Sequence, residues 1–192
     1  HKPLGVVSSQ PEPGYFPAVK LLTDENYYSC RADDGLLPGV RNNGNERFAP
    51  VDLQKIAVCG RLDINSTGLL VFTQRGSLAR RLLSRTLEKE YLVTVNRRCF
   101  RSDVDNLYKG IMSEDQWLTV KSVEIIGDSR LRKILLEGKK HHIRRMCHGR
   151  GLRVIEIERV RIGNVSLADL PLGRWRYLHP HETFSNDDED SF

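Results

Sequence analysis

The segment Gly60–Leu70 reads GRLDINSTGLL and places a charged pair, Arg61 and Asp63, on a short loop between two glycines. The apolar runs on either side, Ile56–Cys59 and Leu69–Phe72, have the length and composition of buried strands. Aspartate and asparagine side chains commonly bond nearby backbone groups in turns, and glycine tolerates the positive φ angles found there. A structural turn is therefore the ordinary interpretation, unless other features of the chain give Asp63 a chemical role.

The composition is that of a basic globular chain. It has 192 residues, of which 39% are hydrophobic and 29% charged, and this is enough for one large domain with a real core. No window approaches the roughly 18 apolar residues of a membrane-spanning helix. The net charge is +5, and removing the four acidic groups of the tail at 185–192 leaves +9. Such a basic body predicts a polyanionic partner.

The cysteine and histidine patterns exclude several chemistries. The four cysteines are scattered and form no Cys-x-x-Cys pair, which argues against a zinc ribbon or a dense disulfide framework and indicates a reducing compartment. The histidines at 141–148 lack the carboxylate spacing of a zinc-binding helix, so no metal site is expected. A phosphate-binding loop, a dinucleotide fingerprint and a nucleophile elbow are also missing from the sequence.

The order of apolar and polar residues predicts many strands and a few short helices. Helices are expected at 77–84, 102–109 and 141–148, with Ser77 and Ser102 as N-caps of the first two. Strands are expected at 6–7, 90–95, 117–126, 131–136, 154–162 and 174–178. Residues 24–50 are rich in turn signals and indicate an irregular surface insertion. This content predicts an α+β fold with a mixed or antiparallel sheet.

The densest positive segment is Lys139–His148, with the sequence KKHHIRRMCH. On a helix, Ile143 and Met146 would face the core while the basic side chains spread around the remaining surface. A solvated basic helix is the ordinary explanation, and contacts with nucleic-acid phosphates are the functional one, because arginine suits bidentate contacts. A second cluster of arginines lies at 75–85. Two such clusters in one small domain favour a nucleic-acid partner.

Positive charge also bears on the role of Asp63. Arg61 lies two positions before it, and the basic helix at 141–148 would lie close if the fold brings it there. Nearby cations favour the ionised form of a carboxylate, as a nucleophile or a general base requires. Tyr91, in the expected strand KEYLVTV, offers an aromatic face on which a base can stack.

Four ordered motifs resemble those of the rRNA pseudouridine synthases. They are GRLDINSTGLLVFTQRG at 60–76, KEYLVTV at 89–95, EGKKHHIRRMC at 137–147 and RVRIGNVSLADLPLGRWRYL at 159–178. The opening HKPLGVVSS is similar to the K-P-x-G start of the branch that modifies single uridines in bacterial small- and large-subunit rRNA. KEYLVTV and the last motif look most similar to the large-subunit enzymes that act on a stem-loop uridine. The resemblance covers most of residues 1–9 and 48–180.

This resemblance implies the pseudouridine synthase catalytic fold, with a mixed, largely antiparallel central sheet, flanking short helices and a basic RNA cleft. It implies that Asp63 starts the detachment of uracil from its ribose on a flipped base, after which the ring rejoins through C5. Tyr91 would pack against the target base and Arg144 would pair with Asp63, which makes these three the expected catalytic residues. The expected substrate-binding residues are Arg61, in the gap left by the flipped base, Ile143, Arg145, Lys140 and His142. The reaction implies no metal and no organic cofactor.

The resemblance also implies partners and domain organisation. We expect ribosomal RNA, in particular that of the large subunit, or a pre-ribosomal particle as partner, and a monomer that does not bind membranes. The expected compartment is the cytoplasm, with the mitochondrial matrix or a plastid as alternatives. A catalytic domain at 1–184 would precede a flexible acidic tail at 185–192, and the S4-type RNA-binding domain usual in the family would be absent from this chain. The alternative function is a non-catalytic RNA-binding factor of ribosome assembly that retains the synthase fold.

Overall fold

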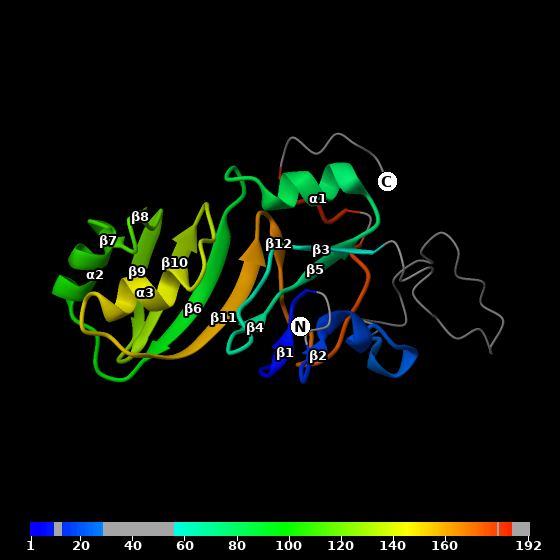
Figure 1. Ribbon diagram of the computed structural model, residues 1–192, viewed down its shortest axis with the longest axis horizontal. Helices are drawn as coiled ribbons and strands as arrows, with labels where there is room; N and C mark the ends of the chain where they lie inside the picture. Colours follow the sequence, from blue (N-terminus) through cyan, green and yellow to red (C-terminus); the bar gives the residue numbers. More distant parts are fainter. Residues whose placement is uncertain (10–12, 29–55, 180, 186–192) are drawn as a thin grey trace.

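A computed structural model describes residues 1–9, 13–28, 56–179 and 181–185. Its central sheet is built around two long strands, β6 (Lys89–Val95) and β11 (Val154–Ile162), which pair with each other (Figure 1). The strand order is β12-β11-β6-β10-β9, and β4 also pairs with β11. The additional strands are β4 (Thr67–Gly68), β9 (Ser122–Gly127), β10 (Arg130–Leu135) and β12 (Val165–Ser166).

The sheet is mixed but largely antiparallel, as predicted. Every pairing along the main strand order is antiparallel, whereas the pairing of β4 with β11 is parallel. Strand β6 has the strict alternation of a half-buried strand, because each second residue from Lys89 to Val95 is buried. The predicted α+β class with flanking short helices is confirmed.

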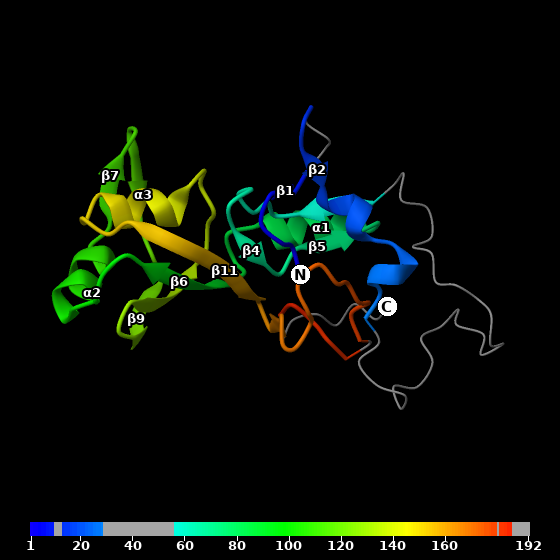
Figure 2. The same ribbon diagram turned by 90° about the horizontal axis from the view of Figure 1, so that it is seen from below.

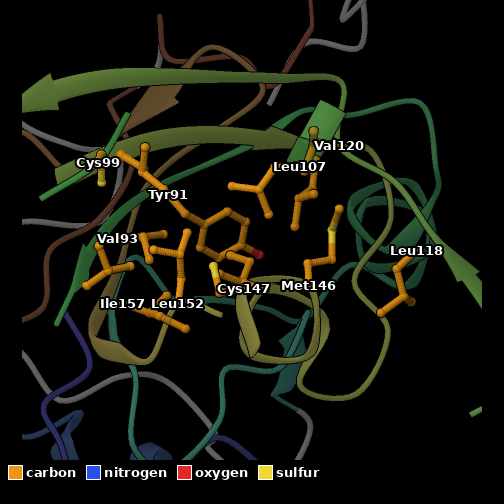
Figure 3. Close-up of a cluster of buried hydrophobic side chains, with 14 of the residues drawn as sticks. Tyr91, Val93, Cys99, Leu107, Leu118, Val120, Met146, Cys147, Leu152 and Ile157 are labelled. Carbon is orange, nitrogen blue, oxygen red and sulfur yellow. The ribbon is translucent and has the colours of Figure 1, made fainter. Parts of the chain in front are cut away.

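The buried apolar side chains form two hydrophobic cores, one in the half of the molecule with α2 and α3 and one in the half with α1. The first packs one part of the sheet against α2 (Arg101–Tyr108) and α3 (His142–His148) (Figure 1). Side chains of α3 close this core against the strands, and Met146 and Cys147 are fully buried (Figure 3). The burial of one face of α3 follows from its apolar residues at 143, 146 and 147, as the helical spacing predicts.

The second core lies beneath α1 (Gly76–Leu83), in the other half of the molecule (Figure 1). Leu82 of this helix packs with residues of the antiparallel hairpin β3 (Ala57–Cys59) and β5 (Val71–Thr73) and with the end of β11. Residues 60–70 connect the two strands of this hairpin, and Thr67–Gly68 within them pairs with β11 of the central sheet.

Short elements complete the described chain. The N-terminal segment, with β1 (Val6–Val7) parallel to β2 (Phe16–Pro17), lies in the half that contains α1 and away from α2 (Figure 2). Two 3₁₀ turns follow, and a hairpin lies between α2 and β9. They are η1 (Ala18–Leu21), η2 (Asp24–Asn26), β7 (Ile111–Ser113) and β8 (Gln116–Leu118).

Two predicted strands differ from the structure. The strand expected at 117–126 is divided, because residues 116–118 pair with β7 whereas residues 122–127 pair with β10. The alternation of apolar and polar residues does not indicate that the pairing strand changes from β7 to β10. The strand expected at 174–178 is reduced to an isolated bridge between Trp175 and Tyr27.

Both predicted serine caps are wrong. Helix α1 begins at Gly76 after Arg75, without a side-chain cap, so Ser77 lies inside the first turn. Helix α2 begins at Arg101, and the carboxylate of Asp103 accepts a hydrogen bond from the backbone N–H of Phe100 at 2.9 Å. Asp103, the third residue of the helix, thus has the role of the acidic residue in a capping box, which the sequence assigned to Asp105.

The expected insertion at 24–50 and the acidic tail lie mostly outside the described residues. At the start of the insertion, the ring of Tyr27 lies 4.9 Å from that of Trp175, centroid to centroid. No helix in the described part of the chain is long and apolar enough to cross a membrane.

Candidate active site

Asp63 lies on a loop whose conformation is fixed by backbone contacts. Gly60 opens the loop with φ of +78°, and the carbonyl of Asp63 accepts a hydrogen bond from the N–H of Ser66 at 3.0 Å. Its side chain is 32% exposed, so the carboxylate is sheltered yet accessible. The buried hydroxyl of Ser8 donates to the carbonyl of Leu62 at 2.7 Å and accepts from its N–H at 2.9 Å. The N-terminal segment thereby holds the loop directly beside Asp63.

A buried lysine adds a second connection between the N-terminal segment and this loop. The amine of Lys2 donates to the carbonyl of Val6 at 2.8 Å, and to that of Ile64 at 3.5 Å. The backbone of Lys2 also exchanges two hydrogen bonds with Gly68. Burial lowers the pKa of Lys2 to about 8, and the negative charge of Asp63 opposes this shift. A cation thus lies close enough to interact with the Asp63 carboxylate.

The N-terminal end of α3 approaches the same loop with two basic side chains, those of His141 and Arg144. The guanidinium of Arg144 donates to the carbonyl of Asn65 at 2.6 Å. The Nε2 atom of His141 lies 3.8 Å from a carboxylate oxygen of Asp63, and the two side chains form an ion pair when the imidazole is protonated. His141 caps the helix in a left-handed conformation with φ of +51°. Arg144 therefore reaches the loop two residues beyond the carboxylate with which it was expected to pair.

Tyr91 lies in the first core, between β6 and α3. Its ring points toward Met146 and Cys147, and its side chain is only 7% exposed (Figure 3). Leu62, the neighbour of Asp63, belongs to the same buried cluster, as does Ile143. Tyr91, Ile143 and Leu62 of the loop thus share one buried apolar cluster.

The remaining predicted substrate-binding residues divide into two groups. Arg61 and Lys140 are exposed to solvent and available to an RNA chain. Arg145 instead holds the β7–β8 hairpin, since it donates to the hydroxyl and the carbonyl of Ser113. His142 is buried with its Nε2 atom 3.0 Å from the carbonyl of Thr119, and burial lowers its pKa. The side chains of Arg145 and His142 are therefore engaged within the fold.

Sequence reasoning missed three cationic residues around the loop, namely His141, Lys2 and Arg159. Lys2 belongs to the K-P-x-G motif, which could have drawn attention to it. His141 was assigned only to a basic surface, and its left-handed backbone has no signal in the sequence. Among the described residues, no group of three or more His, Cys, Asp or Glu could hold a metal ion.

Comparisons with known proteins agree with this geometry. A family model described as RNA pseudouridylate synthase matches residues 1–149. Ribosomal large subunit pseudouridine synthase B of Pasteurella multocida is 38% identical over 126 residues, which cover 62% of this chain and 36% of that protein. Ribosomal small subunit pseudouridine synthase A of Escherichia coli K12 is 33% identical over 184 residues, which cover 93% of this chain and 76% of that protein.

A solved structure supports the same relationship. The crystal structure of a pseudouridylate synthase matches with a TM-score of 0.70 and 25% identity, over 90% of this chain and 65% of that one. The catalytic-loop motif, the fold and the match over residues 1–149 therefore agree, and this chain belongs to the RNA pseudouridylate synthase family.

Proposed function

We propose that this chain isomerises a uridine of ribosomal RNA to pseudouridine. The observation that carries the proposal is the Asp63 carboxylate, one-third exposed on a loop held by Ser8 and Lys2 from one side and by Arg144 from the other. The reaction breaks the bond between N1 and the ribose C1′ and forms a bond between C5 and C1′. The C5 proton leaves and N1 gains a proton, so no oxidant, reductant or metal is required.

Each side chain at the site has a defined part in this chemistry. Asp63 starts the detachment of the base from its ribose. Tyr91 and Ile143 provide an apolar wall beside the base, which must leave the RNA stack to reach the loop. Arg61 and Lys140 are exposed and would contact the RNA. Two observations support these roles: Leu62, Tyr91 and Ile143 share one apolar cluster, and Arg61 and Lys140 are exposed.

The finer proposal concerns the target. KEYLVTV and the run at 159–178 favour a uridine in large-subunit rRNA, although a relative aligned over 93% of this chain is a small-subunit synthase. Transcripts of both rRNAs, offered separately, would distinguish the two targets. We further propose a monomer that acts in the cytoplasm or in an organelle.

Tritium release from rRNA labelled at uracil C5 tests the proposal directly, because the rearrangement must free that hydrogen. We expect release by the wild type and loss of at least about 10³-fold in rate in Asp63→Asn, which removes the charge but not the volume. Asp128→Asn is the matched control, since this carboxylate is 87% exposed on the β9–β10 turn and its replacement should not change the rate.

The same experiment separates the enzyme from the alternative, a non-catalytic assembly factor. An assembly factor would bind rRNA without releasing tritium, and Asp63→Asn would support ribosome assembly as well as the wild type does. Full activity of Asp63→Asn would contradict the proposed role of the carboxylate.

A further inference from the structure

Arg159 is a buried guanidinium that faces the base of the catalytic loop. It lies in β11 and is only 2% exposed. Its Nε atom donates to the carbonyl of Leu69 at 2.8 Å, and its Nη2 atom donates to the carbonyl of Gly60 at 3.3 Å. Gly60 and Leu69 stand at opposite ends of the loop that carries Asp63. One side chain therefore joins the two ends.

The backbone of Arg159 strengthens this connection. Its carbonyl accepts a hydrogen bond from the N–H of Leu69 at 2.7 Å, and it is the parallel partner of Gly68. A Cβ atom at Gly68 would lie 2.3 Å from the carbonyl oxygen of Arg159, so only glycine permits this approach. At Gly60, which also has a positive φ, a Cβ would lie 3.7 Å from the Nη1 atom. Gly68 is thus required for the close approach of Arg159, whereas a Cβ at Gly60 would be in ordinary contact with it.

Arg159 also contacts the other half of the site. On the opposite side of β11, it is the cross-strand partner of Tyr91 in β6. The same residue thus pairs with the strand that carries Tyr91 and holds both ends of the loop that carries Asp63. Any shift of this residue would change the position of the carboxylate relative to the tyrosine ring.

The charge of Arg159 is costly to bury. In the described part of the chain, its hydrogen bonds go to backbone carbonyls, and it has no carboxylate within ion-pair distance. A buried charge without a counterion is a poor source of stability. The guanidinium does, however, supply two directed donors in a rigid plane, which suits the task of fixing the separation of two carbonyls.

We propose that Arg159 is a positioning residue for catalysis, which sets the geometry of the Asp63 loop against Tyr91. This inference rests on the proposed synthase function. A misplacement of about 1 Å in a catalytic group can cost about a hundredfold in rate without a change in substrate contacts. Loss of Arg159 should therefore lower the rate of the chemical step and leave the KM for RNA nearly unchanged.

Lys89 provides a matched control for the effect of removing a buried cation. Its amine donates to two backbone carbonyls, those of Ser84 at 2.9 Å and Leu136 at 3.2 Å. Neither carbonyl belongs to the loop at 60–69. Arg159→Met and Lys89→Met thus remove the same kind of interaction, but only the first removes it from the catalytic loop.

The test compares Arg159→Met, Arg159→Lys and Lys89→Met by two readouts. The first is hydrogen exchange of the backbone amides at 60–69, and the second is single-turnover pseudouridine formation with its dependence on RNA concentration. In Arg159→Met we expect faster exchange across the loop, and a rate lowered about tenfold to a hundredfold with a KM within about threefold of the wild type. Arg159→Lys should recover part of the rate, because an ammonium can reach one of the two carbonyls.

Lys89→Met should leave loop exchange and rate near those of the wild type, even if it loses as much stability as Arg159→Met. Equal loop exchange and equal rates in Arg159→Met and Lys89→Met would overturn the inference, as would an effect of Arg159→Met on KM alone. If Arg159→Met fails to fold, Arg159→Lys carries the same comparison. If the wild type forms no pseudouridine, the proposed function fails, whereas loop exchange still decides whether Arg159 positions Asp63.

Discussion

Replacing Lys133 with methionine should stabilise the protein. Lys133 lies in β10 opposite Tyr91 and is fully buried. Among the described residues, its amine donates to the thiol sulfur of Cys147 at 2.9 Å, and sulfur is a weak acceptor. Methionine has a similar length and no polar group to desolvate, so it can occupy the same space between the sheet and α3.

The magnitude follows from two opposing contributions. A buried polar group with a poor partner costs about 1–3 kcal/mol in mutational studies. Repacking around a side chain of similar volume costs up to about 1.5 kcal/mol. We expect a net gain of about 1–2 kcal/mol in the free energy of unfolding of Lys133→Met. For a chain of this size, that corresponds to a rise in Tm of roughly 2–8 °C.

Thermal unfolding and urea titration would measure both quantities. Lys109→Met is the control, because Lys109 is exposed after α2 and its replacement reports only on the loss of a surface charge. Cys147→Ala should destabilise the protein by about 1–3 kcal/mol, since it removes the acceptor and leaves the amine buried. A lower Tm for Lys133→Met than for the wild type would refute the reasoning, because the amine would then contribute more than it costs.

Three further predictions concern a glycine and two ionisable groups. Gly68→Ala should destabilise the protein by about 3 kcal/mol or more in urea titration, because the new Cβ would overlap the carbonyl of β11 at a φ of +115°; Gly76→Ala, with open space around it, should not. Relative to Lys2→Met, the wild type should gain stability as the pH rises from about 8 toward 10.5, since the folded state binds fewer protons there than the unfolded state; a parallel pH dependence of the two proteins would refute this. The hydrogen bonds from Arg97 hold the pKa of Asp103 below its usual value of 3.8. The wild type should therefore be more stable than Asp103→Asn above pH 3.8, and this difference in stability should be lost as the pH falls through the lowered pKa. Acid titration followed by circular dichroism would test this.

Local patterns were sufficient to predict much of the fold. The alternation of KEYLVTV produced β6 as expected, because one face of a strand must be buried while the other meets solvent. The apolar spacing within KKHHIRRMCH predicted α3 and its buried face. Asp63 itself could be singled out only through the ordered motifs around it, because an aspartate on a loop between two strands is ordinarily a turn residue.

The relations between distant segments could not be predicted from these patterns. The partner of each strand depends on tertiary packing, so the division of residues 117–126 between two hairpins left no local signal. His141 lies near Asp63 in a left-handed conformation at the N-cap of α3, for which the sequence has no signal. Arg159 looked like one charged residue of a strand until the structure placed its guanidinium under the loop.

The hydrogen bonds from Arg159 to the loop at 60–69 also bear on when this loop can form. They join residues that are 90 and 99 positions apart, with the loop as the earlier segment. During synthesis, the segment at 60–69 is therefore made long before the strand that holds it, and it must wait for β11 to leave the ribosome. Contacts of such long sequence separation form slowly, because their loop-closure entropy is lost before any stabilising interaction is gained. The carboxylate should thus reach its final position late in folding, after helix α3 has been synthesised.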